Sequence, residues 1–310
     1  MTSAECEICG SSDAPLSIDR ATDYITGARF AVGLCPRCGL GTTTPRPASM
    51  DPYYPVRYRQ YSGLTLRLLR SLYAWRVRGW ARRLSRQGRA LEVGCGDGWM
   101  LAALRDRGWR VLGSERSIDG ARSAAATNRI PVFVGDFDAL GASARFDLII
   151  LFQVLEHLAE PLVTLRRSAR LLEHGGVMVV AVPNIASWQA RLFGRSWFHL
   201  DVPRHLHHFS PAALACAFEK AGLTVVRTRF VSLEHDPYGW VQSVLNRMGF
   251  KQNLLTRLLM GMGRDEVSIA TVVPMVALSA LLVIPSVALS LCSWVAGSGA
   301  IMEMWAAKTP

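Results

Sequence analysis

The chain has 310 residues, of which 50% are hydrophobic and 19% are charged, and its formal net charge is +11. This length suits one α/β domain of about 200 residues with smaller attachments, and the composition excludes a disordered chain. The excess of positive charge favours partners that carry phosphate, on a lipid surface, a nucleotide-linked substrate or a nucleic acid.

Residues 1–45 are predicted to form a zinc module. Cys6 and Cys9 form one CxxC pair, and Cys35 and Cys38 form a second. Two such pairs complete a tetrahedral structural site that has no open position for chemistry. The sequence opens without a signal-peptide pattern, and paired cysteines in a reducing cytoplasm favour zinc over disulfides. The alternative is a redox or vacant site.

Residues 46–88 are basic and aromatic. Ten arginines and no acidic residue occur between Pro52 and Leu91. This run predicts a surface that attracts phosphate, and the alternative is an ordinary solvated helix face.

A strand, a glycine-rich turn and a helix follow. Residues 90–93 are apolar apart from Glu92 and are predicted to form a short strand, Gly94, Gly96 and Gly98 form the turn, and residues 99–104 have helical periodicity. Glycines at such a turn let a ligand approach the backbone closely. A dinucleotide fingerprint would need a glycine at Trp99, so a nicotinamide-dependent oxidoreductase is disfavoured.

Further strands are expected at residues 109–114, 132–134, 146–152, 177–182, 224–230 and 300–306. The strand at 146–152 is a nearly continuous apolar run, which is typical of a parallel sheet covered on both faces.

The order of these motifs resembles that of the class I S-adenosylmethionine (SAM)-dependent methyltransferases. Their first motif, (E/D)xGxGxG, is matched from Glu92 to Gly98. The segment Val154-Leu-Glu-His157 is similar to ubiquinone-pathway O-methyltransferases and to sugar methyltransferases, several of which also carry N-terminal CxxC pairs. The resemblance covers roughly residues 50–235. It implies a doubly wound, seven-stranded Rossmann-like α/β sheet with an antiparallel last strand.

The resemblance also implies a cofactor site. Glu115 ends the second strand, where it would accept hydrogen bonds from both ribose hydroxyls, and Asp136 and Phe137 would hold the adenine. The expected cofactor-binding residues are Glu92, Gly94, Gly96, Gly98, Glu115, Asp136, Phe137, Phe152 and Gln153. Related enzymes often place a lid before the first strand, where this chain has Tyr53, Tyr54, Tyr58 and Tyr61; the alternative is a packed linker.

Two histidines are candidates for a catalytic base, which methyl transfer to a hydroxyl or an acidic carbon requires. His157 follows the carboxyl end of the fourth strand, where open α/β sheets bind ligands, and its alternative role is to fix a loop. His205 belongs to an RHLxxF step that related methyltransferases share, and a metal site there is disfavoured.

The segment from Val267 to Met302 has 36 residues without a charge. In the resembled fold the last strand is antiparallel to the sixth, so both ends of this insertion should lie on one side of a membrane. Two helices of about fifteen residues are too short for a double crossing. A shallow hairpin in one leaflet is therefore predicted, flanked by Arg257 and Arg264, and a subunit interface or a cap over the site is the alternative.

The sequence thus predicts a zinc-binding module at 1–45, a helical lid or linker at 46–88, a SAM-binding core at 89–240, an apolar helical insertion at 241–299 and a final strand at 300–310. The expected cofactors are SAM and structural Zn²⁺. The expected activity is SAM-dependent methyl transfer to a sugar, glycan or lipid-linked intermediate, by a cytoplasmic enzyme in peripheral or monotopic contact with the inner face of the cell membrane. A quinone-type aromatic acceptor is the alternative within this class. A zinc-dependent nucleic-acid-binding protein is an alternative from another class, which the apolar segment disfavours.

Overall fold

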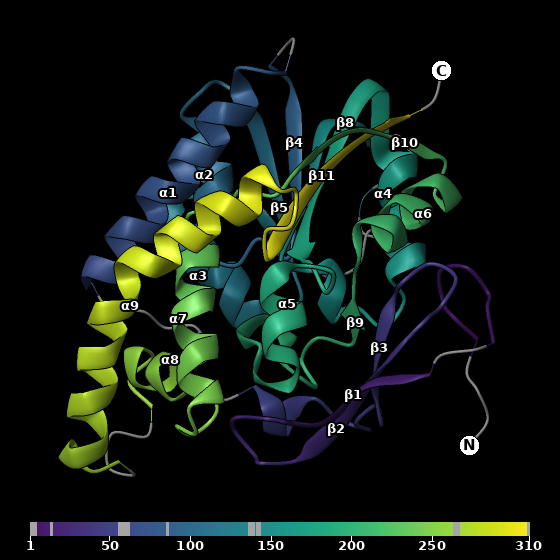
Figure 1. Ribbon diagram of the computed structural model, residues 1–310. Helices are drawn as coiled ribbons and strands as arrows, with labels where there is room; N and C mark the ends of the chain where they lie inside the picture. Colours follow the sequence, from purple (N-terminus) through teal and green to yellow (C-terminus); the bar gives the residue numbers. More distant parts are fainter. Residues whose placement is uncertain are drawn as a thin grey trace. The chain divides into compact units, whose positions relative to one another are not determined.

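The structure is a computed structural model, and it describes residues 5–12, 15–54, 63–84, 87–135, 140, 144–262 and 267–308. The chain forms two compact units, whose elements are labelled in Figure 1. The first unit comprises Met1–Leu66, Pro183–Leu214 and Arg229–Met302. The second unit comprises Arg67–Val182, Ala215–Thr228 and Glu303–Pro310. Each unit is thus assembled from three segments that are far apart in the sequence.

The second unit contains a seven-stranded sheet with the strand order β10-β11-β8-β7-β4-β5-β6. Strands β4 to β8 pair in parallel, and the final strands are antiparallel, which confirms the predicted Rossmann-like fold. The strands are β4 (Arg89–Val93), β5 (Arg110–Glu115), β6 (Val132–Val134), β7 (Phe146–Phe152), β8 (Leu172–Pro183), β10 (Leu223–Arg229) and β11 (Ile301–Lys308).

Helices accompany this sheet and supply its hydrophobic core. They are α1 (Gly63–Ala81), α2 (Trp99–Arg105), α3 (Ile118–Asn128), α4 (Pro161–Leu171) and α6 (Pro211–Lys220). Val77 and Trp80 of α1 and Leu101 of α2 pack in one core with Leu148 and Ile150 of β7. Because β7 is buried along both faces, its nearly continuous apolar sequence is explained.

Four arginines of the predicted basic run lie on α1, and three of them face solvent. Arg67, Arg70 and Arg78 are exposed, as expected of a solvated helix face. Arg76 instead points inward and forms a buried ion pair with Glu303 of β11. The indole N–H groups of Trp80 and Trp305 also donate to this carboxylate, at 3.2 and 2.9 Å. The buried charge is therefore fully hydrogen-bonded.

The first unit contains a four-stranded antiparallel sheet with the order β1-β2-β3-β9. Its strands are β1 (Leu16–Thr22), β2 (Arg29–Leu34), β3 (Gly41–Thr44) and β9 (His207–His208). Its helices are α5 (Trp188–Phe193), α7 (Asp236–Arg247), α8 (Leu254–Leu259) and α9 (Ile269–Val295), with short 3₁₀ helices η1 (Asp51–Tyr53), η4 (Gly194–Ser196) and η5 (Phe198–Leu200). Phe30 and Val32 of β2 share a core with Trp197 and Trp240.

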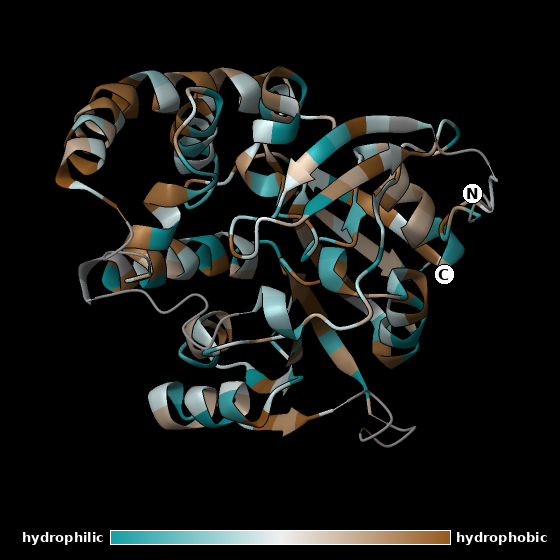
Figure 2. Cartoon of the chain, turned by 90° about the horizontal axis from the view of Figure 1, so that it is seen from below, coloured by the Kyte–Doolittle hydropathy of each residue, from teal (hydrophilic) through white to brown (hydrophobic). Residues whose placement is uncertain are grey.

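The apolar segment before the last strand is one helix, so the predicted hairpin of two helices was wrong. Helix α9 runs unbroken for 27 residues and contains Pro274 and Pro285. From Ile269 to Val295 the sequence has no Gly, Asn or Asp, the residues that a tight turn between two helices favours. The first glycine after the helix is Gly297, in the left-handed conformation with a φ of 64°. Figure 2 shows that α9 is hydrophobic along most of its length.

Candidate functional site

The turn between β4 and α2 has the geometry of a ligand cradle. Gly94, Gly96 and Gly98 have φ angles of 65°, 51° and 70°, a backbone region that favours glycine. A Cβ atom at Gly94 would lie 2.7 Å from a methyl group of Val154, and one at Gly98 would lie 3.0 Å from Ile130. Within the described residues, nothing lies within 4 Å of the Cβ position at Gly96. The outer glycines permit close packing, and the middle one faces open space.

Glu115 lies beside this turn at the end of β5. Its Oε2 accepts a hydrogen bond of 3.0 Å from the Gly96 N–H, and its Oε1 accepts one of 2.8 Å from the Arg116 N–H. These two bonds fix the carboxylate next to the open space above Gly96. Each oxygen keeps a further lone pair for a ligand hydroxyl, as the predicted ribose clamp requires.

Two more of the predicted residues carry buried polar atoms. Within the described residues, Glu92 Oε2 and Gln153 Nε2 have no hydrogen-bond partner. Burial and the nearby charge of Glu115 raise the pKa of Glu92 to about 8. Gln153 has a φ of 56°, and its N–H donates to the Ala181 carbonyl at 2.8 Å. Buried polar atoms normally have partners, so these fit a site completed by a polar ligand.

An aromatic cluster lies next to the predicted Phe152. The ring of Tyr73, on α1, contacts Phe152 edge to face at 5.7 Å and lies 6.0 Å from the ring of Trp99. The sequence reasoning missed Tyr73. The sequence does indicate its position, because Tyr73, Val77 and Trp80 are spaced by four and three residues and so lie on one face of a helix.

Other predicted residues fall elsewhere. Asp136, Phe137, Tyr58 and Tyr61 lie outside the described residues. Tyr53 belongs to the first unit, where its ring contacts Phe30 edge to face at 5.8 Å.

His157 lies in the second unit, in a 3₁₀ turn after β7, η3 (Leu155–His157). Its N–H donates to the Val154 carbonyl at 3.0 Å, and the side chain is half-buried. Because the side chain of Val154 lies over Gly94, this turn lies against the glycine turn. His157 is therefore placed near the cradle by local structure alone.

His205 lies in the first unit and is buried. Its Nδ1 is 2.9 Å from the carbonyl oxygen of His199, and its Nε2 is 3.9 Å from Asp201 Oδ2. Since a carbonyl only accepts, Nδ1 carries a proton and donates to His199. Arg204 fixes the same segment through Asp201 at 2.7 Å and Asp23 at 2.8 Å.

The four N-terminal cysteines converge in the first unit, as predicted. Their sulfur atoms all lie within 4.8 Å of one another, with Cys6 and Cys38 at 3.5 Å and Cys9 and Cys35 at 3.4 Å. A tetrahedral zinc site with Zn–S bonds of about 2.3 Å needs sulfur atoms about 3.8 Å apart. The two CxxC turns match, because Gly10 and Gly39 both have a φ of 74° and donate at 2.8 Å to Cys6 and Cys35.

The thiols of the cluster differ in their protonation, because burial raises the pKa of Cys6 and of Cys38 whereas the pKa of Cys35 is lowered. Burial alone would raise the pKa of Cys35, but hydrogen bonds from the Cys38 and Arg37 backbone and from neighbouring cysteines lower it to about 6. Metals bind the thiolate. The donor set, its spacing and its chemistry therefore fit Zn²⁺.

A Rossmann-like sheet with a glycine turn of the form ExGxGxG, and a carboxylate fixed at the end of the next strand, is the arrangement expected of a SAM-dependent methyltransferase. The chain belongs to the family described as a methyltransferase domain, whose model matches residues 59–228. The enzyme therefore uses SAM, and the open space above Gly96 together with Glu115 fits this cofactor.

Known relatives agree with this assignment. The chain is 29% identical over 171 residues to the ubiquinone biosynthesis O-methyltransferase of Cereibacter sphaeroides, a match that covers 51% of this chain and 68% of that protein. It is 26% identical over 153 residues to the ubiquinone biosynthesis O-methyltransferase of Brucella ovis, covering 44% and 60%. A SAM-dependent methyltransferase from Archaeoglobus fulgidus has a similar fold, with a TM-score of 0.50 at 17% identity over 77% of this chain and 94% of that one.

Proposed function

We propose that this methyltransferase works in contact with the cytoplasmic face of a membrane and methylates a hydroxyl group of a lipid-linked sugar or glycan intermediate. The observation that carries the proposal is that helix α9 buries mainly serines and exposes apolar side chains to its surroundings. Its buried residues are Met275, Ser286, Ser290 and Ser293. Its exposed residues include Ile284 and Val295, whose surfaces are 80% and 92% accessible. A surface helix of a protein in water has the opposite arrangement.

The dimensions of α9 suit a lipid environment. A helix of 27 residues is about 40 Å long, compared with about 30 Å for the hydrocarbon core of a bilayer. The helix is long and apolar enough to cross a membrane, and only 11% of its most apolar window is buried. Its small serines face inward, which allows close packing on a neighbouring helix. Of the two predicted flanking arginines, Arg257 lies on α8, and Arg264 lies outside the described residues.

A hydroxyl acceptor requires a base, and two histidines are candidates for it. When bound, SAM supplies an electrophilic methyl group, and its sulfur keeps the electron pair of the broken C–S bond. The acceptor hydroxyl forms the new O–CH₃ bond and gives its proton to a base. His157, beside the glycine turn, is the first candidate for this base. His205, which is buried in the first unit, is the second candidate.

Zinc is proposed as a structural ion at the four cysteines. Four sulfur ligands complete its coordination, so it would stabilise the N-terminal sheet without joining the reaction.

A second candidate acceptor is a quinone-type aromatic compound. The similar proteins of Cereibacter sphaeroides and Brucella ovis are named ubiquinone biosynthesis O-methyltransferases. Such acceptors also reside in membranes, so the exposed face of α9 is compatible with either substrate class.

The test uses the full-length protein in nanodiscs, SAM labelled in its methyl group and a total membrane lipid extract. We expect label in the lipid fraction with the wild-type protein and none with Gly96→Arg. Mild acid cleaves the sugar from a polyprenyl-phosphate carrier, so the label should then move to the aqueous phase. Label that stays in the organic phase would instead favour the quinone-type acceptor. Absence of label from the lipid fraction would contradict both acceptors.

A further inference from the structure

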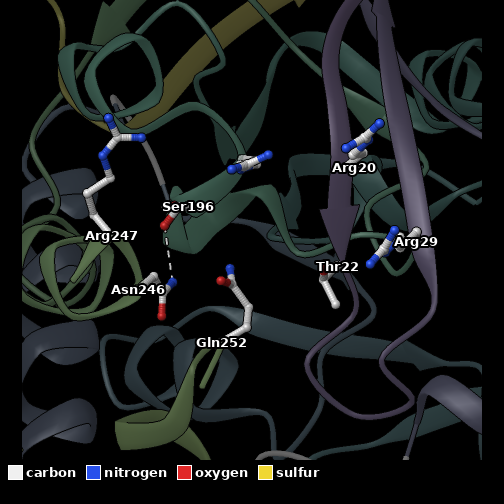
Figure 3. A pocket seen from close by; sticks show the side chains of 8 residues that line it. Arg20, Thr22, Arg29, Ser196, Asn246, Arg247 and Gln252 are labelled. Carbon is white, nitrogen blue, oxygen red and sulfur yellow. Dashed lines mark hydrogen bonds between the residues drawn. The ribbon is translucent and has the colours of Figure 1, made fainter. Parts of the chain in front are cut away.

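We infer that the first unit contains a binding site for a diphosphate group, in a hollow lined by arginines from four separate elements (Figure 3). The arginines are Arg20 of β1, Arg29 of β2, Arg195 of η4 and Arg247 at the end of α7. Figure 3 shows Arg20 and Arg29 on one side and Arg247 on the other. This site goes beyond methyl transfer, and its binding is measurable whether or not a methyl group is transferred.

The hollow is large enough for more than one phosphate group. Its volume is about 470 Å³, within the range of about 300–1,000 Å³ that is usual for ligand pockets. At about 30 Å³ per water molecule, it has room for roughly fifteen waters. A diphosphate with part of an attached group therefore fits.

Most of the positive charge of the hollow is uncompensated by acidic side chains of the described residues. Its lining contains no acidic residue. Arg20 has one exposed partner outside the lining, Asp19, at 3.5 Å. Among the residues that the structure describes, Arg29, Arg195 and Arg247 have no acidic partner within ion-pair distance. Cations gathered at one place repel one another, and a multivalent anion between them would relieve that repulsion.

The four arginines of the lining favour a multivalent anion over a single carboxylate. Guanidinium groups offer paired N–H donors that match phosphate oxygens, and several such groups can surround a diphosphate from different directions. The remaining lining residues, Thr22, Ser196, Asn246 and Gln252, are all neutral and polar.

A buried amide network holds one side of the hollow in place. Asn246 Nδ2 donates to the Ser196 carbonyl at 3.1 Å and to Asn253 Oδ1 at 2.9 Å. Asn246 Oδ1 accepts from Gln242 Nε2 and from the Asn253 N–H, both at 2.9 Å. These bonds join η4 to the end of α7, so they position Arg195 and Arg247 before a ligand arrives.

The diphosphate could belong to a nucleotide or to a lipid. Helix α7 carries Arg247 at its end, and its Val241 and Leu245 pack against Met275 of α9. The hollow and the proposed membrane helix thus share a supporting element. Both sources offer the same diphosphate chemistry, and binding measurements separate them.

The test is calorimetric titration of the full-length protein with sodium pyrophosphate at low salt. The double variant Arg29→Gln/Arg247→Gln removes one arginine from each side. We expect it to bind about 100-fold more weakly, because each lost charge-assisted contact weakens binding by about tenfold. Arg191→Gln is the matched control, since Arg191 is an exposed arginine of α5 outside the hollow. It should bind pyrophosphate as the wild-type protein does.

Three results would overturn the site: equal affinity in the wild type and the double variant, equal weakening by Arg191→Gln, or equal affinity for phosphate and pyrophosphate. SAM binding checks that the double variant is folded, and the two single variants replace it if it is not. Tighter binding of UDP than of pyrophosphate supports a nucleotide ligand. Capture by phosphatidylcholine vesicles that contain farnesyl diphosphate, but not by plain vesicles, supports a lipid ligand.

Discussion

The backbone N–H of Gly96 donates a hydrogen bond of 3.0 Å to Oε2 of Glu115, and so joins the turn after β4 to the end of β5. The bond orients the predicted ribose clamp from the same turn that the cofactor approaches. A side chain at position 96 would enter the open space above the turn and would also strain a left-handed residue.

Gly96→Arg should therefore abolish SAM binding in a calorimetric titration. Gly222→Arg is the matched control, because Gly222 has a φ of 77° and open space around it but lies in the turn before β10. Both variants incur a backbone cost of about 1–2 kcal/mol. Retained SAM affinity in Gly96→Arg would contradict the placement of the cofactor.

Glu92 should make the SAM-free protein less stable as pH rises. Burial and the charge of Glu115 raise its pKa from 4.5 to about 8 in the folded state. Between these two pKa values the folded state holds a proton that the unfolded state releases. The contribution of Glu92 to the free energy of unfolding is therefore complete below pH 4.5 and is lost as pH rises towards 8. Asp236, whose pKa burial also raises to about 8, adds a change in the same direction.

Glu92→Gln mimics the neutral form of the carboxyl group and should remove the contribution of Glu92 to the pH dependence of stability. As pH rises from 6 to 8, urea unfolding should show that the free energy of unfolding of the variant increases by about 2 kcal/mol relative to that of the wild type. The exposed Glu219→Gln should follow the wild type. If the free energies of unfolding of Glu92→Gln and the wild type differ by the same amount at every pH in this range, Glu92 is charged in the folded protein.

A catalytic base should be revealed by a loss of kcat without a loss of SAM affinity. His157→Gln or His205→Gln should lower kcat by about 10²–10⁴-fold. His174→Gln replaces an exposed histidine and serves as the control. If neither variant lowers kcat, the reaction does not rely on either histidine, and the hydroxyl chemistry proposed here loses its base.

Cys35→Ser should release zinc, because it removes one of four sulfur ligands. The N-terminal sheet then loses the ion that stabilises it, and Tm should fall by roughly 5–10 °C. Metal analysis and thermal unfolding measure the two effects. Cys216→Ser is the control, since Cys216 is half-buried and lies outside the cluster. Purified wild-type protein that contains no zinc, yet unfolds at the same temperature as Cys35→Ser, would argue for a vacant site.

Membrane contact through α9 should depend on its exposed apolar side chains. Leu281→Glu/Ile284→Glu changes two side chains that are 75% and 80% exposed. Each change should weaken the association by about 2 kcal/mol or more, so co-flotation with phosphatidylglycerol vesicles should fall more than tenfold. Leu192→Glu, at an α5 residue that is 65% exposed, is the matched control. Equal flotation of the wild type, the double variant and Leu192→Glu would show that α9 does not mediate membrane contact.

The features that the sequence predicts well are local ones. The glycine turn needs only residues 92–98 and a strand before it, and the β7 strand is evident from its own apolar run. The CxxC turns are equally local, although their meeting depends on the β1–β2 hairpin between them. Glu115 could be placed from the family resemblance because it ends β5, the strand that follows α2.

Non-local pairing is what the sequence could not supply. Strand β9 has only two residues, His207 and His208, and it pairs with Gly41 and Thr42, which precede it by more than 160 residues. No periodicity reveals so short a strand. The arginine hollow has the same origin, because its arginines come from four elements that only the fold brings together. The hairpin was expected from the topology of the two ends of the insertion, whereas the segment forms the single helix α9.

Strand β11 lies between β8 and β10, although it is made after both of them. The ribosome therefore releases α9 before the sheet can close, and β8 and β10 must wait with exposed edges for the strand that separates them. Helix α9 and its exposed apolar side chains therefore emerge while the seven-stranded sheet still lacks β11. The sheet can close only after the whole of α9 has been made.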